Sequence, residues 1–286
     1  MDGRVRLLSV GLALPMLALA SLTQAVELNP AVVTVRTPDQ YKWRDPANKG
    51  PGNQVPLLGD GKTGHYVHIT KWNKGNNFSR PHFHANDRLV YILSGTWWNG
   101  TGTAFDPKNT IPIPAGSFVT HHAKGVHWDG GKDEDAVLLI IGEGPSASTR
   151  VKETEGTFST LNPAAVTYLT PDQFKWRDPS HKATANQVIL YGNPAKPGLY
   201  ITINKFSNGF NRPHMHPSDR FSIVLQGTWW VGTGAKFDPN NTVAMMPGTV
   251  VTHARKGVHF DGAKEGDALI LVTGIGPASA VQAEQK

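Results

Sequence analysis

The chain consists of one sequence unit present twice, and this duplication limits the folds that it can adopt. Residues 37–46 (TPDQYKWRDP) return as residues 170–179 with one of ten positions changed. Residues 95–107 (GTWWNGTGTAFDP) return as residues 227–239 with ten of thirteen positions identical. The copies are offset by 133 residues at the first match and by 132 at the second. A unit of about 115 residues is the size of one domain, so each copy can close its own core.

Short strands separated by Gly and Pro turns are expected inside each unit. Residues 89–93 (LVYIL) and 221–225 (FSIVL) are rich in strand-favouring side chains. Residues 137–141 (VLLII) and 269–272 (LILV) are apolar runs typical of buried strands. Thirty Gly and 21 Pro suit a turn-rich β protein. The sequence therefore predicts an all-β chain, organised as sandwiches or barrels.

The first 25 residues differ from the repeated units. Arg4 and Arg6 precede an apolar stretch at 7–19, and residues 23–25 (TQA) form a small-residue cleavage sequence. This pattern is typical of a secretory signal and is too short for a stable membrane span, the alternative being an uncleaved anchor. We expect cleavage after Ala25, a periplasmic or secreted protein, and no stable membrane anchor.

Composition sets the remaining boundaries and narrows the chemistry. Residues 146–161 (SASTRVKETEGTFSTL) are polar, so we expect a first barrel at 26–145, a linker at 146–161 and a second barrel at 162–286. The net charge is +6, but Lys and Arg are scattered, which disfavours a nucleic-acid partner. The chain has no Cys, so a metal would have to be bound by His, Asp or Glu.

Three histidines recur at the same relative positions in both units. Each unit has a His-x-His pair, and residues two apart on a strand point to the same face. A further histidine follows downstream, within the sequences GVHW and GVHF. Neighbouring positions have changed between the copies while the histidines have not, which favours a metal site in each unit. The predicted ligands are His82, His84 and His127 in the first unit, and His214, His216 and His259 in the second.

The spacing of these residues resembles the two motifs of the cupin superfamily, and the paired units resemble a bicupin. The matching residues are Gly75, His82, His84, Gly95, Gly116, Gly125 and His127 in the first unit, and Gly248, Gly257 and His259 for the second motif of the second unit. The resemblance implies two tandem double-stranded β-helix (jelly-roll) barrels. It also implies one divalent metal ion per barrel, which we expect to be Fe, Mn, Zn or Ni.

One departure from the family pattern concerns a metal ligand. The family places a glutamate seven residues before the glycine that ends its first motif, and here Arg88 and Arg220 occupy that position. Arginine is cationic and does not bind metals. Either Asp87 and Asp219 supply the carboxylate through a strand bulge, or each metal is held by three histidines and solvent.

The arginines suggest two alternative roles. Arg88 and Arg220 would pair with the neighbouring aspartates, or they would bind an anionic substrate, because a buried charge needs a partner. Arg80 and Arg212 would share that face if the strand is regular. His121 and His253 also recur, and they would either orient a ligand or lie at the surface.

Two functions remain open. The first is a metalloenzyme acting on a small organic molecule, which could be anionic, with dioxygenase-like, hydrolase-like or isomerase-like chemistry at the open metal positions. The second is a non-catalytic periplasmic protein that captures a ligand or uses the metal for stability. The cupin fold hosts both, and a homo-oligomer is compatible with either.

Overall fold

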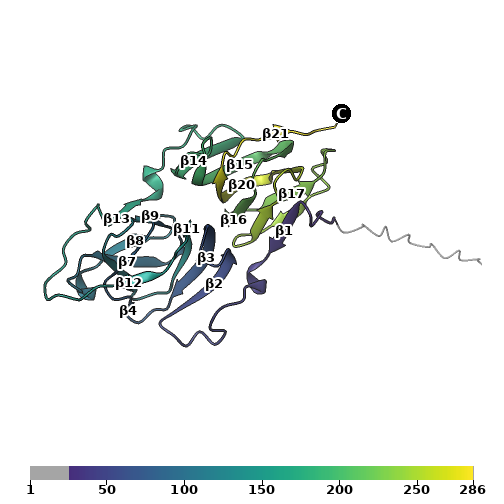
Figure 1. Cartoon of the computed structure of the whole chain (residues 1–286). Helices are drawn as coiled ribbons and strands as arrows, with labels where there is room; N and C mark the ends of the chain where they lie inside the picture. Colours follow the sequence, from purple (N-terminus) through teal and green to yellow (C-terminus); the bar gives the residue numbers. More distant parts are fainter. Residues whose placement is uncertain (1–25, 286) are drawn as a thin grey trace, which may run out of the picture.

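The computed structural model describes residues 26–285, so the expected signal segment lies outside the described residues. Strands are the main secondary structure (Figure 1), and the prediction of an all-β chain is confirmed. The strands up to residue 150 are β1 (Val33–Arg36), β2 (Gly52–Leu58), β3 (His65–Trp72), β4 (Asn77–Phe78), β5 (His82–His84), β6 (Arg88–Ser94), β7 (Thr96–Thr101), β8 (Ile111–Pro114), β9 (Phe118–His121), β10 (His127–Gly131), β11 (Ala136–Glu143) and β12 (Ser148–Arg150). Those that follow are β13 (Val166–Leu169), β14 (Ala185–Tyr191), β15 (Gly198–Met215), β16 (Arg220–Gln226), β17 (Trp229–Thr233), β18 (Val243–Met245), β19 (Val250–His253), β20 (His259–Gly276) and β21 (Val281–Gln282). The short 3-10 helices are η1 (Pro38–Gln40), η2 (Pro107–Asn109) and η3 (Pro171–Gln173).

Each repeat forms a jelly-roll barrel. In the first barrel, one sheet has the order β13-β9-β6-β11-β3-β2, and the other has the order β12-β5-β10-β7-β8 with β4 beside β10. In the second barrel, β15 and β20 are 18 residues long and run through both sides, so the hydrogen bonds join all its strands into one sheet. Register shifts in the pairing of these two strands mark where they bend.

The first strand of each repeat belongs to the barrel of the other repeat. Strand β1 pairs antiparallel with β19, and β13 pairs antiparallel with β9. In Figure 1 the purple β1 accordingly lies against the green and yellow barrel, while β13 lies beside β9 in the teal barrel. The two barrels are therefore joined by a reciprocal exchange of strands as well as by the chain between them.

The apolar runs are continuous because their strands are buried on both faces. In β6, Val90 and Ile92 pack inside the first barrel, whereas Leu89 and Tyr91 pack in a core that both barrels share. The second repeat contributes to the same shared core, for example through Phe221 of β16. An alternating strand with one solvent-facing side would not need apolar residues at every position.

The segment expected to be a linker has a structural role. Its residues 148–150 form β12, which pairs with β5, the strand that carries His82 and His84. The three residues of β12 are exposed, which explains their polar character. Within residues 26–285, no helix has the length and apolar character needed to cross a membrane.

Candidate metal centre

The first barrel brings its three predicted histidines together. Strand β5 carries His82 and His84 two residues apart, and His127 begins β10 directly opposite His82. All three side chains are buried, and one ligand nitrogen from each lies within 4.8 Å of the others. Adjacent strands thus place three imidazoles on one inner face of the barrel.

The second barrel repeats this arrangement. His214 of β15 lies opposite His259 of β20, and His216 follows just after the end of β15. These side chains are also buried, with one nitrogen of each within 4.8 Å of the others. The ring centroids of His214 and His259 are 4.4 Å apart, the same distance as for His82 and His127.

Backbone carbonyl groups orient all six imidazoles in the same way. In each ring, Nδ1–H donates to a main-chain oxygen, which leaves the Nε2 lone pair free to bind a metal. The acceptors are Arg80 O for His82 (2.8 Å), Ala147 O for His84 (3.2 Å), Gly125 O for His127 (2.9 Å), Arg212 O for His214 (2.8 Å), Ser279 O for His216 (2.9 Å) and Gly257 O for His259 (3.0 Å). The buried Nε2 atoms of His84, His127 and His216 have no protein partner. Donor type, tautomer and unpartnered atoms therefore all fit a divalent metal.

Burial lowers the pKa of His84, His127, His216 and His259 and keeps these imidazoles neutral, as metal ligation requires. Burial lowers the pKa of His84 and of His216 to about 3, and the positive charges of Arg88 and Arg220 add to this effect. Burial also lowers the pKa of His259 to about 4. At neutral pH these buried rings carry no charge, so their Nε2 lone pairs are free of competing protons.

Arg88 and Arg220 point into the barrels beside the histidines. Each begins a strand, β6 or β16, and donates from Nη2 to one carbonyl oxygen, that of Ser146 (2.7 Å) or Ala278 (2.6 Å). The Nε atoms of both are buried and have no partner. Each guanidinium is therefore anchored on one side and retains donor capacity toward the barrel interior.

Asp87 and Asp219 lie away from the histidine groups. Asp87 accepts hydrogen bonds from the backbone N–H of Ala123 (2.8 Å) and from the Tyr191 hydroxyl of the other repeat (3.2 Å). Asp219 accepts one from the backbone N–H of Arg255 (2.7 Å). Both carboxylates thus fix the loop that leads to the third histidine, and no register shift occurs where β6 begins.

Arg80 and Arg212 turn outward into surface ion pairs. Arg80 binds Glu153 (3.1 Å) and lies over the ring of Phe105, while Arg212 binds Glu284 and lies over Phe237. The regular strand that would have turned them inward is interrupted, because the β15–β20 pairing shifts register between Asn211 and His214.

His121 and His253 are buried next to the third histidine of each barrel. The His121 ring centroid is 3.7 Å from that of His127, and the corresponding distance from His253 to His259 is 4.2 Å. Each of the two histidines is the last residue of its strand, β9 or β19, and pairs with the arginine that begins the neighbouring strand. Their surface placement is therefore excluded, since they are 1% and 3% exposed.

Two buried aspartates near the sites were missed in the sequence. Asp129 and Asp261 accept hydrogen bonds from the indole N–H groups of Trp97 (3.3 Å) and Trp229 (3.1 Å). Burial raises the pKa of Asp129. A signal was present, because each aspartate lies two residues after the third histidine, on the same strand face, and recurs at the offset of 132.

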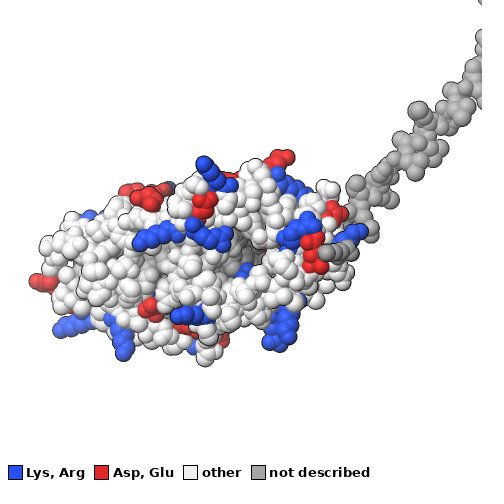
Figure 2. Space-filling model, turned by 90° about the horizontal axis from the view of Figure 1, so that it is seen from above, with Lys and Arg blue, Asp and Glu red and all other residues white. Residues whose placement is uncertain are grey.

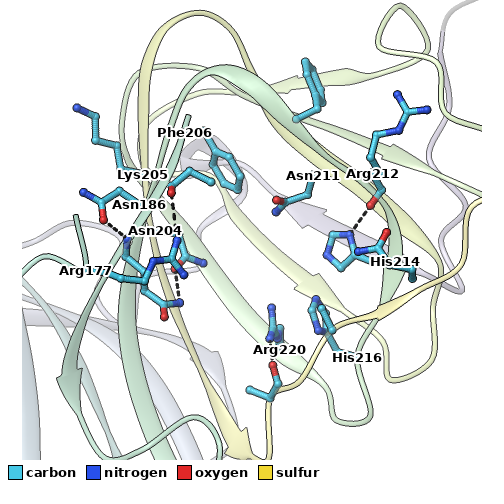
Figure 3. A pocket seen from close by; sticks show the side chains of 16 residues that line it. Arg177, Asn186, Asn204, Lys205, Phe206, Asn211, Arg212, His214, His216 and Arg220 are labelled. Carbon is cyan, nitrogen blue, oxygen red and sulfur yellow. Dashed lines mark hydrogen bonds between the residues drawn. The ribbon is translucent and has the colours of Figure 1, made fainter. Parts of the chain in front are cut away.

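The two sites differ in access. A cavity of about 500 Å³ in the second barrel is lined by His214, His216 and Arg220, and it adjoins a cavity of about 290 Å³ that Arg220 also lines (Figure 3). Deeper inside, the cavity beside His82 and Arg88 in the first barrel is about 80 Å³, and its counterpart beside His214 and Arg220 in the second barrel is about 30 Å³. The second barrel therefore has room for an organic ligand in the large cavity that its histidines and Arg220 line.

The side chains that line the large cavity differ from those at the same places in the first repeat. The wall of the large cavity carries Asn204 and Phe206, where the first repeat has Thr70 and the larger Trp72 at the same places in the strand pairing. The Gln187 side-chain N–H donates to the Asn204 carbonyl oxygen (2.8 Å), which leaves an amide N–H₂ and an amide oxygen of this pair for a ligand.

Comparisons with known proteins identify the fold. No family model and no curated protein sequence matches the chain. Among solved structures, oxalate decarboxylase from Lactobacillus farciminis is 13% identical with a TM-score of 0.58 and coverage of 87% of this chain and 88% of its own. Ylba from E. coli is 10% identical, with a TM-score of 0.59 and coverage of 90% and 96%. Vicilin from Corylus avellana is 10% identical, with a TM-score of 0.56 and coverage of 89% and 88%. The chain therefore has the cupin superfamily fold in its two-barrel form, as its histidine motifs implied.

Proposed function

We propose that this protein is an exported metal-binding bicupin that takes a small anionic organic molecule at the metal site of its second barrel. The cavity above that site carries the proposal. Arg177, Lys205, Arg212 and Arg220 line it, and no Asp or Glu does. Lys205 and Arg212 are paired with Asp267 and Glu284, whereas Arg177 and Arg220 have no ion-pair partner among residues 26–285. A concave site with one sign of charge attracts ligands of the opposite sign.

Arg220 is the residue best placed to hold such a ligand. Its guanidinium lies beside His216 in Figure 3, is held on one side by Ala278 O, and keeps its buried Nε free. Guanidinium groups bind carboxylates through two parallel hydrogen bonds, which favours a carboxylate here. The amides of Gln187 and Asn204 would orient the remainder of the molecule. On the face of the molecule seen in Figure 2, by contrast, Lys and Arg are scattered rather than gathered in one place.

The metal would supply Lewis-acid or oxygen-binding chemistry at coordination positions that three histidines leave open. We propose His214, His216 and His259 as its ligands in the second barrel, and His82, His84 and His127 in the first. One of the similar solved structures, Bacillus subtilis oxalate decarboxylase, is described with Mn(II) centres, so Mn²⁺ is the first metal to test and Fe, Zn and Ni follow.

A metal that only stabilises the fold is a second candidate role for the first barrel. A cavity of about 80 Å³ holds a few water molecules and no substrate of ordinary size. A metal at this site would stabilise the fold. The first barrel would then hold a structural metal while the second binds the ligand.

The test uses the chain without residues 1–25. Elemental analysis after growth with each metal is expected to find two ions per chain, and His127→Ala and His259→Ala are each expected to lose one. His181→Ala, which changes an exposed histidine outside both sites, is the matched control. Less than one ion per chain under every metal supplement would contradict the proposal.

A ligand screen then separates enzyme from binding protein. Thermal shift and calorimetry with oxalate, keto acids, phenolic acids and small diketones identify the ligand class, and oxalate is included because of the oxalate decarboxylase likeness. Oxygen uptake and mass spectrometry of the recovered ligand follow. Conversion of the ligand identifies a metalloenzyme, and unchanged ligand identifies a binding protein. Localisation of the tagged full chain by cell fractionation tests export.

A further inference from the structure

A third group of buried metal-binding side chains lies in the first barrel, deeper than the His-x-His pair. His121 at the end of β9, with His127 and Asp129 of β10, place one ligand atom each within 4.8 Å of one another. Their exposed fractions are 1%, 0% and 6%. Two histidines and one carboxylate are a ligand set that holds divalent metals with open coordination positions.

The two histidine nitrogens of this group lack the partners that buried polar atoms normally have, and the carboxylate has no charged partner. His121 Nδ1 and His127 Nε2 make no hydrogen bond within the described chain. Asp129 accepts only from neutral donors, the Trp97 indole N–H (3.3 Å) and the Ser79 hydroxyl (3.4 Å), and no ion pair involves it among residues 26–285. A buried carboxylate needs a positive partner, and a metal ion at this place would supply it.

Asn99 explains why the group forms in the first barrel. Its side-chain oxygen lies 3.0 Å from His121 Nε2, which makes Nε2 the protonated donor and leaves the Nδ1 lone pair free. The His121 ring lies nearly parallel to Trp97, at 28° and 4.9 Å. Asn99 therefore fixes both the tautomer and the ring orientation that direct Nδ1 toward His127 and Asp129.

The second barrel has the same three side chains without the orienting amide. Val231 stands where Asn99 stands in the strand pairing, opposite the aspartate. His253 has an unpartnered Nε2, and its ring is inclined at 62° to Trp229 at 5.6 Å. Within the described residues, His253, His259 and Asp261 do not form such a group.

We propose that the first barrel offers a divalent cation a second coordination position, formed by His121 Nδ1, His127 Nε2 and the Asp129 carboxylate. This position, here called the inner position, shares His127 with the three-histidine position, so one ion occupies one or the other. The inference rests on the metal binding proposed above. A carboxylate ligand suits Mn²⁺ better than a site of imidazoles alone, which suits Zn²⁺.

Mn²⁺ titration followed by electron paramagnetic resonance tests the inner position. The first barrel is isolated in the His214→Ala/His216→Ala chain, and His84→Ala is added to remove the three-histidine position. The expected result is one Mn²⁺ per chain, because the inner position does not use His84. The matched His216→Ala change, in a His82→Ala/His127→Ala chain, is expected to abolish binding by the second barrel.

Two further variants locate the bound ion. In the chain lacking His84, His214 and His216, Asp129→Asn is expected to abolish Mn²⁺ binding. Asn99→Val, which installs the residue of the second repeat, is expected to weaken binding roughly 10- to 100-fold because it removes only an orienting contact. Circular dichroism establishes that each variant folds. If Asp129→Asn does not fold, Asn99→Val alone provides the test.

The outcomes separate this inference from the proposed function. Loss of all Mn²⁺ on His84→Ala alone in the isolated first barrel, or unchanged affinity in the folded Asn99→Val variant, overturns the inner position and leaves metal binding by three histidines intact. Absence of Mn²⁺ and of every other metal from the unaltered chain overturns both.

Discussion

Val33 lies opposite His253 in the pairing of β1 with β19, so the first described strand of the first repeat completes the barrel of the second. Val166 lies opposite His121 in the equivalent pairing of β13 with β9. Each exchanged strand thus covers the strand that ends in the buried histidine beside the metal site of the other repeat. Stability and site geometry in one barrel therefore depend on residues that belong to the sequence of the other.

The exchange predicts that damage to β1 appears in the second barrel. Val33 is 3% exposed and packs in the core of that barrel, so Val33→Ala is expected to lower the free energy of unfolding by about 2 kcal/mol. Hydrogen exchange should accelerate at 250–253 and not at 118–121. Val35→Ala, at a position that is 38% exposed, should change stability by less than about 0.5 kcal/mol. Faster exchange in the first barrel would contradict the pairing.

Metal removal is expected to destabilise the protein, because a ligand that binds only the folded state stabilises it. A metal present at 100 times its dissociation constant contributes about 2.7 kcal/mol per site. Chelation should therefore lower the Tm measured by calorimetry, and the decrease should be smaller in His127→Ala and in His259→Ala. A Tm that is the same with and without chelator, in protein shown to contain metal, would exclude sites of this affinity.

Loss of the Arg220 guanidinium should weaken ligand binding. A charge-assisted hydrogen bond contributes about 1.5–3 kcal/mol, so Arg220→Gln is expected to reduce ligand affinity roughly 10- to 100-fold with metal content unchanged. Arg88→Gln is the matched control, because Arg88 has the same place in the first barrel and does not line the cavity of about 500 Å³. Equal losses of affinity in both variants would show that the ligand does not enter the second barrel alone.

Acid is expected to destabilise the fold through buried neutral histidines outside the metal ligands. Burial lowers the pKa of His65 and of His68 to about 4 in the folded protein, from the ordinary value of 6.5. Between these pH values the unfolded chain therefore binds more protons than the folded protein. The free energy of unfolding has its highest value from this source above pH 6.5 and decreases as the pH falls toward 4. Urea unfolding at a series of pH values should show this decrease.

His68→Thr isolates one of these contributions, because Thr202 holds the equivalent place in the strand pairing of the second repeat. The variant should have a weaker dependence of stability on pH, with its largest gain over the unaltered chain near pH 4. His181→Thr, which changes an exposed histidine, is the control and should leave the dependence in place. An unaltered dependence in His68→Thr would contradict the neutral state of His68.

The sequence predicted the elements of the fold better than their partners. The duplication, the strands and the histidine spacing are local patterns, and local patterns are set by backbone geometry. The exchange of β1 and β13 was not predictable in this way, because two similar repeats offer each strand two similar places to pair. The polar residues 148–150 suggested a linker because β12 is an exposed strand, and exposure on a sheet edge permits polar side chains.

The site shows the same division between local and irregular features. The spacing along the sequence predicted that Arg88 and Arg220 lie beside the histidines. They do, because β6 and β16 begin at those residues without a bulge. The same reasoning predicted that Arg212 faces inward. That prediction is wrong, because the strand pairing shifts register between Asn211 and His214. The wall of the large cavity depends on single differences between the repeats, such as Phe206 where the first repeat has Trp72, and their effect appears only when the strands are placed in space.

The reciprocal pairing of β1 and β13 also predicts how a chain of a single repeat would assemble. A single repeat would carry an N-terminal strand that its own barrel does not receive, and a barrel edge that awaits the strand of another copy. Two such chains would satisfy each other by domain swapping, as a symmetric homodimer. The present chain thus has the architecture of a swapped dimer whose subunits have been fused, and fusion removes the symmetry that would force both sites to stay alike. That freedom accounts for the differences between two sites built from one unit, such as Asn99 in the first barrel and Val231 at the same place in the second.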